Sequence, residues 1–161
     1  MVWLLSLVKP SHRPRQYLGM PAVPNSHIDP VPERKKRIMI VDDDVSICEI
    51  FRLILTNAGY EVIIQTDPHS LLRQNILWPD LFLIDKQLPD LDGLDLCRHL
   101  KSQQQTSKIP VIMISAVTDI SFLSKEAGAD SCIEKPFEMS VLTETLRKFL
   151  GEGANSKKSL V

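Results

Sequence analysis

The 161-residue chain has no surplus of charge, no paired cysteines and no apolar run long enough to cross a membrane. Its 19 basic and 20 acidic residues give a net charge of -1, which provides no basic surface for nucleic acid or an anionic membrane. The apolar N-terminal segment MVWLLSLV is far shorter than a membrane span and has no basic residues before it. We therefore expect no nucleic acid binding and no membrane association, with a signal peptide or an interfacial anchor at residues 1–8 as the alternative.

The three cysteines, Cys48, Cys97 and Cys132, are odd in number, widely spaced and placed inside apolar segments. This pattern is typical of reduced core residues in a cytosolic protein, rather than of a disulfide framework or a zinc site. We accordingly expect a cytoplasmic protein.

The composition predicts one folded domain between two flexible ends. More than half of the 11 prolines lie in residues 1–36, which show no sustained period of two or 3.6 and are expected to form a disordered extension. That extension could be a linker, a docking tail or sequence upstream of the natural start. Residues 151–161, GEGANSKKSLV, are polar and predict a flexible tail. The domain itself is expected to span residues 37–150.

Within this domain, short apolar runs alternate with amphipathic segments. The expected strands are residues 37–42, 61–65, 81–85, 111–115 and 131–134. The expected helices are residues 45–57, 68–77, 93–102, 118–127 and 138–150, and the inward face of the first is expected to be Ile47, Ile50, Phe51 and Ile54. Continuous apolar strands separated by helices predict an α/β fold, a doubly wound parallel sheet covered on both faces.

Polar residues follow the apolar strands at their carboxyl ends, where ligands bind in an open α/β sheet. Asp42 and Asp43 follow the first strand, Asp85 ends the third, Ser115 ends the fourth, and Lys135 follows the fifth. Adjacent carboxylates require a cation, and an all-oxygen site with few protein ligands suits Mg²⁺. A carboxylate beside Mg²⁺ can act as a nucleophile toward phosphorus, while a lysine and a hydroxyl contact the phosphoryl oxygens.

Four motifs in order, IMIVDDD, DLFLIDKQLPDLDGLDLCRHLK, IPVIMISA and GADSCIEKPF, fall on the expected strands and their carboxyl ends. With them, residues 36–150 resemble the receiver domain of two-component response regulators. The resemblance implies a flavodoxin-like (βα)5 fold with a five-stranded parallel sheet of order 2-1-3-4-5.

The resemblance also implies a role for each polar residue. Asp85 looks like the phosphoacceptor. Asp42 and Asp43 look like the acidic pair that binds Mg²⁺ together with Asp85, and Gln87 would offer its backbone carbonyl to the metal.

The remaining motif positions concern the switch. Ser115 is similar to the family's Ser/Thr switch residue, Ala116 to the small residue beside it, and Lys135 to the phosphate-binding lysine, with Lys135-Pro136 as the family's cis peptide. Cys132 departs from the pattern, because the family usually carries an aromatic residue there whose rotamer change reports phosphorylation. A thiol is too small for that movement, so we interpret Cys132 as a small buried residue, with redox sensing as the alternative.

The function implied is that of a stand-alone receiver, phosphorylated on Asp85 from a phosphohistidine of a histidine kinase or a histidine phosphotransfer protein. It would catalyse only its own phosphorylation and dephosphorylation, and would signal through an unidentified protein partner or a phosphorelay, since residues 151–161 are too few for a DNA-binding domain. A homodimer through the face of helix four, strand five and helix five is a further expectation.

One alternative to the phosphorylated receiver is a scaffold that is never phosphorylated. The other is a phosphohydrolase with an aspartyl nucleophile, disfavoured because Gln87 replaces the second Asp of the D-x-D motif.

Overall fold

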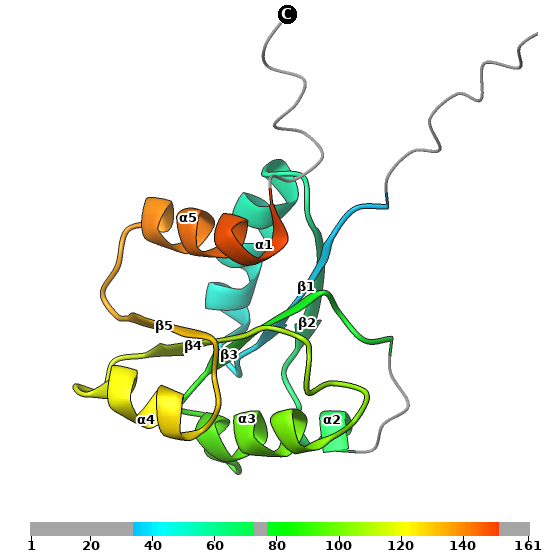
Figure 1. Cartoon of the computed structure of the whole chain (residues 1–161). Coiled ribbons are helices and arrows are strands. Elements are labelled where there is room, and N and C mark those ends of the chain that lie inside the picture. Colours follow the sequence, from blue (N-terminus) through cyan, green and yellow to red (C-terminus); the bar gives the residue numbers. More distant parts are fainter. Residues whose placement is uncertain (1–33, 73–76, 152–161) are drawn as a thin grey trace, which may run out of the picture. The chain divides into compact units, whose positions relative to one another are not determined.

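Five parallel strands form one sheet in the order β2-β1-β3-β4-β5, as Figure 1 shows for the computed structural model, which describes residues 34–72 and 77–151. The strands are β1 (Arg37–Val41), β2 (Glu61–Gln65), β3 (Leu81–Asp85), β4 (Val111–Ser115) and β5 (Ser131–Glu134). The helices are α1 (Val45–Asn57), α2 (His69–Leu72), α3 (Gly93–Ser102), α4 (Ile120–Glu126) and α5 (Met139–Leu150). The predicted fold class and strand order are therefore confirmed. No helix in the described ranges is long and apolar enough to span a membrane.

Two hydrophobic cores lie on opposite faces of the sheet, because alternate residues of each strand point to opposite sides. One core joins β1, β3 and β4 to α2, α3 and α4, and it contains Met39, Phe82, Met113, Leu71, Leu96 and Ile120. The other joins the sheet to α1 and α5, and it contains Ile40, Leu83, Ile112, Phe51, Leu55 and Leu146. Burial of each such large side chain stabilises the fold by about 1.5–3 kcal/mol. The helices are thereby held on both faces, as Figure 1 shows.

Two carboxylates connect the starts of neighbouring strands at the amino edge of the sheet. Asp80 Oδ2 accepts a hydrogen bond from the Arg37 backbone N–H at 2.7 Å, and the Arg34 guanidinium donates to both carboxylate oxygens at 2.8 and 3.0 Å. In the same way Asp130 Oδ2 accepts from the Val111 backbone N–H at 2.8 Å and from Lys101 Nζ at 2.6 Å. Asp80 therefore holds the first residue of β1, and Asp130 holds the first residue of β4.

The inward face of α1 differs from the prediction. Its buried stripe is Cys48, Phe51 and Leu55, whereas Ile50 is 54% exposed. The helix is apolar on its outer side as well, so a helical period of apolar residues does not by itself identify the side that faces the sheet. The prediction for Ile50 is wrong, and the true stripe begins one residue later than expected.

Several element ends also differ. β1 stops at Val41, because Asp42 leaves the sheet to accept a hydrogen bond from the Asp44 backbone N–H. The expected second helix begins at His69, residues 73–76 lie outside the described residues, and Leu77 is not helical. α4 begins at Ile120 because Asp119 takes a left-handed conformation with φ of 66°. The expected extension and tail lie outside the described residues, except for residues 34–36 and 151.

Candidate functional site

Three of the predicted site residues, Asp42, Asp85 and Lys135, meet at the carboxyl edge of the sheet. The parallel register pairs Val41 with Ile84 and Asp85 with Ile114, so the ends of β1, β3 and β4 lie side by side. Asp42 directly follows β1, Asp85 ends β3, and both carboxylates are buried, with 4% and 7% of their residue surface exposed.

Asp85 is held by two hydrogen bonds. Its Oδ1 accepts from Lys135 Nζ at 2.6 Å, and its Oδ2 accepts from the Gln87 backbone N–H at 2.7 Å. Lys135 is anchored in turn, because its backbone N–H donates to the Ser115 carbonyl at 2.7 Å, and its bond to Pro136 is cis. The lysine therefore reaches the end of β3 from the residue that follows β5.

Asp42 is the less compensated carboxylate. Its Oδ1 accepts from the Asp44 N–H at 2.9 Å, and its Oδ2 lies 3.9 Å from Lys135 Nζ. Burial raises the pKa of Asp42, and the charges of Asp85 and Asp43 raise it further against the opposing effects of the Asp44 N–H and Lys135. Further positive charge at this edge would therefore stabilise the ionised form of Asp42.

The remaining predicted residues are placed differently. Ser115 is fully buried, and its Oγ accepts a hydrogen bond from the Val117 N–H at 3.0 Å. Asp43, Gln87 and Ala116 are exposed. Within residues 34–72 and 77–151, no side-chain hydrogen bond or ion pair joins Ser115 or Asp43 to Asp85 or Lys135.

Asp44 and Asp92 have structural roles, each as the N-cap of a helix. Asp44 is the N-cap of α1, since its carboxylate accepts from the N–H groups of Ser46 and Ile47 at 2.8 and 3.2 Å. Asp92 is the N-cap of α3, and its carboxylate accepts from the Leu94 N–H at 2.8 Å.

Gly93 is a site-supporting residue that was not predicted from the sequence. A Cβ atom there would lie 2.1 Å from the carbonyl oxygen of Asp85, so only glycine lets α3 begin so close to the end of β3. The Gly93 N–H also donates to the Lys86 carbonyl at 2.9 Å. A signal was present, because glycine is a poor helix former and here it occupies the first helical position.

The donors at this edge fit a magnesium ion, although no three His, Cys, Asp or Glu side chains of the described chain form a metal-binding group by themselves. Mg²⁺ is usually held by one or two carboxylates and retains several waters. The buried Asp42 and Asp85 supply such a pair of oxygen donors. Burial and the neighbouring carboxylates raise the pKa of Asp42, an effect that a bound cation would oppose.

Comparison with known proteins gives consistent matches. Residues 38–147 match the family model described as the response regulator receiver domain. The DNA-binding response regulator MtrA of Mycobacterium tuberculosis is 36% identical over 116 residues, which are 70% of this chain and 50% of MtrA. The chain spans about half the length of the curated relatives it matches.

Two solved structures extend this likeness to the backbone. The chemotaxis response regulator CheY4 of Vibrio cholerae has a TM-score of 0.67 at 27% identity, with 73% of this chain and 100% of CheY4 covered. The response regulator TrrA of Thermotoga maritima, solved in complex with Mg²⁺-BeF, has a TM-score of 0.63 at 28% identity, with 71% of this chain and 99% of TrrA covered.

Proposed function

The chain belongs to the response regulator receiver domain family, and from this premise we propose that it is phosphorylated on Asp85 by a phosphohistidine of a histidine kinase or a phosphotransfer protein. The observation that carries the proposal is the 2.6 Å contact between Lys135 Nζ and Asp85 Oδ1 at the carboxyl edge of the sheet. The lysine places a positive charge beside the buried carboxylate that would act as the nucleophile, and it stands where the phosphoryl oxygens would arrive.

In the proposed reaction a carboxylate oxygen of Asp85 attacks phosphorus. The new oxygen–phosphorus bond forms as the phosphorus–nitrogen bond to histidine breaks, and the electron pair of that bond stays on the imidazole. The Gln87 N–H holds the other carboxylate oxygen, at 2.7 Å in the structure, and so orients the nucleophile. Lys135 then pairs with a phosphoryl oxygen, and Ser115 donates its hydroxyl to another.

Asp42, Asp43 and Asp85, with the Gln87 backbone carbonyl, are the proposed ligands of Mg²⁺, which when bound supplies positive charge against the phosphoryl oxygens. The two buried carboxylates support this assignment. Asp43 is exposed and directly follows Asp42, and its assignment as a ligand rests on its position in the family's motif.

Phosphorylation is proposed to act through Ser115 on the surface formed by α4, β5 and α5, which would bind a protein partner, a second copy of the chain or the next protein of a phosphorelay. Because Cys132 on β5 has a short side chain, the proposed response does not rely on a moving aromatic ring at that position. The chain is proposed to act in the cytoplasm and to have no catalytic activity beyond its own phosphorylation and dephosphorylation.

The test is incubation of the purified chain with acetyl phosphate and Mg²⁺, followed by intact mass measurement. The expected result is one added phosphoryl group in the wild-type chain and none in Asp85→Asn, which keeps the size of the side chain. An unmodified wild-type chain would favour a scaffold that is not phosphorylated, and equal labelling of Asp85→Asn would place the phosphoryl group elsewhere. Steady turnover of a generic phosphate ester would instead indicate a phosphohydrolase.

A further inference from the structure

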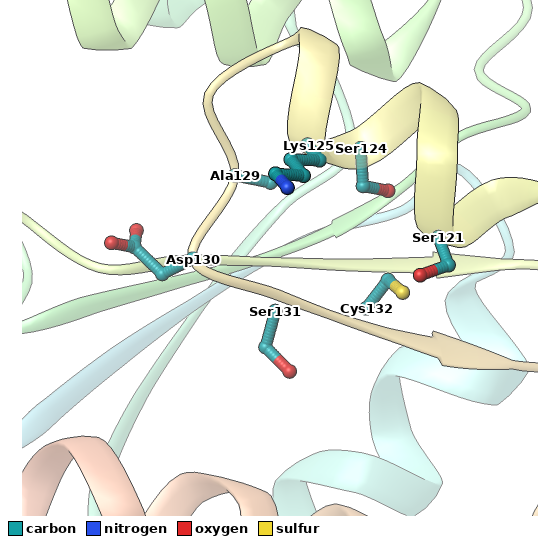
Figure 2. A pocket seen from close by; sticks show the side chains of 7 residues that line it. All are labelled: Ser121, Ser124, Lys125, Ala129, Asp130, Ser131 and Cys132. Carbon is teal, nitrogen blue, oxygen red and sulfur yellow. The ribbon is translucent and has the colours of Figure 1, made fainter.

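A pocket of about 520 Å³ opens between α4 and the edge strand β5 (Figure 2). It contains none of the residues of the proposed phosphorylation site. Its lining includes Ser121, Ser124, Lys125, Asp130, Ser131 and Cys132. The lining is therefore mostly polar, which favours a polar ligand over an apolar one.

Cys132 provides the reactive group of this pocket. Figure 2 shows its side chain directed from β5 toward α4, whereas Ser131 points to the other side of the strand. Cys132 packs against the core beneath α4, as expected of a small core residue, but it is only partly buried. Because the cysteine side chain is small, the space above it stays open.

Ser124 provides an independent sign of a ligand. This residue of α4 is 2% exposed and lines the pocket, yet its hydroxyl has no hydrogen-bond partner among the described residues. A buried hydroxyl without a partner is destabilising, and native proteins seldom keep one unless water or a ligand satisfies it. An acceptor group inside the pocket would satisfy it.

The charges on the lining indicate the kind of acceptor. Asp130 is already compensated, since its carboxylate accepts from Lys101 Nζ at 2.6 Å and from the Val111 N–H at 2.8 Å. The ammonium of Lys125, which is exposed, therefore favours an anionic group in the pocket. A carboxylate fits both the lysine and the unpaired hydroxyl.

We propose that this pocket is a modification site in which Cys132 exchanges with a small disulfide that carries carboxylates. The Cys132 thiolate attacks one sulfur of the disulfide, a new sulfur–sulfur bond forms as the old one breaks, and the other half leaves as a thiolate. Ser124 and Lys125 hold the carboxylates of the part that remains attached. The proposal is independent of phosphorylation at Asp85.

The other two cysteines serve as internal controls. Cys48 and Cys97 are both buried, and burial raises the pKa of each thiol to about 11. Both are therefore expected to stay unmodified in the folded chain, because the thiolate is the reacting form.

The test compares two disulfide probes on the reduced full chain, oxidised glutathione, which carries carboxylates, and cystamine, which carries amines. Intact mass and peptide mapping follow the adduct. We expect modification at Cys132 alone. The ratio of the glutathione disulfide rate to the cystamine rate should be about twofold to fivefold higher in the wild-type chain than in Lys125→Gln, which is the size of one exposed charge contact. Ser124→Ala should slow the glutathione reaction, while Lys148→Gln on α5 should leave it unchanged.

Cys132→Ser gives the background for these rates. The proposal is overturned if Cys132 reacts only in urea, or if Lys125→Gln and Ser124→Ala leave the relative rates of the two probes unchanged. Labelling with acetyl phosphate in parallel separates the two proposals, because a chain that is not phosphorylated but is modified at Cys132 contradicts only the proposed function.

Discussion

Lys135 Nζ lies 2.6 Å from Oδ1 of Asp85 but 3.9 Å from Oδ2 of Asp42, so one ammonium forms a close ion pair with the first buried carboxylate and a longer one with the second. Lys135 thereby links the end of the sheet's central strand to the segment that follows its edge strand. We therefore expect both the stability of this edge and the proposed phosphorylation to depend on the charge of Lys135.

Replacement of Lys135 by Met should lower the free energy of unfolding by about 2 kcal/mol. It leaves Asp85 without its charged partner, while the Gln87 N–H bond and the partial exposure of the lysine limit the loss. Phosphorylation by acetyl phosphate should be lost. Urea unfolding measures the first effect and intact mass the second. In an Asp85→Asn background the same replacement should cost clearly less, and an equal cost in both backgrounds would show that the pair does not interact.

Asp42 should destabilise the folded chain at neutral pH. Because its pKa is raised in the folded state, that state holds the proton more tightly, and the free energy of unfolding falls as the pH rises from about 4 through the raised pKa. Asp42→Asn should therefore be more stable than the wild type at pH 7 without Mg²⁺, with a smaller difference near pH 3.

Magnesium provides the matching control for Asp42. Mg²⁺ should raise the melting temperature of the wild-type chain at pH 7 and have little effect on Asp42→Asn, because we propose that the ion binds the folded state through that carboxylate. If Asp42→Asn were less stable than the wild type at pH 7, the ionised Asp42 would not be destabilising. Equal stabilisation of both chains by Mg²⁺ would contradict the role of Asp42 as a ligand.

Gly93→Ala should destabilise the chain by about 1–3 kcal/mol, the usual cost of overpacking, because the added methyl group would meet the Asp85 carbonyl oxygen. It should also slow phosphorylation, since Asp85 must shift. Gly128→Ala is the control. Its positive φ of 83° is unfavourable to alanine, but its Cβ would meet only the Lys101 side chain, so it should lower stability and leave phosphorylation intact. Equal phosphorylation rates in both variants would contradict a positioning role for Gly93.

The sheet was predictable because each strand is a short apolar run bounded by polar residues. β3 and β4 have the expected bounds, and the residues at their carboxyl ends meet as the topology requires. The buried face of α1 was not predictable, because Ile50 and Leu53 make its outer side apolar too. The sequence pattern carries no information about which side a neighbouring element covers.

The identity of the site residues was easier to predict than their contacts. Asp42 and Asp43 are adjacent and chemically identical, yet the turn after β1 buries the first and exposes the second. The contact of Gly93 with Asp85 depends on how closely two backbone segments approach. Such distances follow from the packing of α3 against the sheet, which no local pattern specifies.

Asp43 and Asp44 should separate chemistry from stability. Asp44→Ala removes the N-cap of α1 and should cost about 1 kcal/mol while the chain is still phosphorylated. Asp43→Ala changes an exposed side chain, so it should alter stability little and abolish Mg²⁺-dependent phosphorylation. Urea unfolding and intact mass on both variants check this, and loss of phosphorylation in Asp44→Ala alone would reverse the assignment.

Asp80→Ala should lower the free energy of unfolding by about 2 kcal/mol, because it removes the acceptor for the Arg37 N–H and for the Arg34 guanidinium. Burial raises the pKa of Asp80, but these donors outweigh it and lower the pKa. The stabilisation by Asp80 is therefore present at neutral pH and is lost as the pH falls below about 4 toward the lowered pKa. Arg34→Gln is the control, since it removes an exposed charge but keeps the Arg37 bond, and it should cost less than about 1 kcal/mol. Unfolding measured between pH 2 and 7 tests both variants. Equal losses in the two would mean that the ion pair, rather than the bond to the start of β1, is what stabilises this edge.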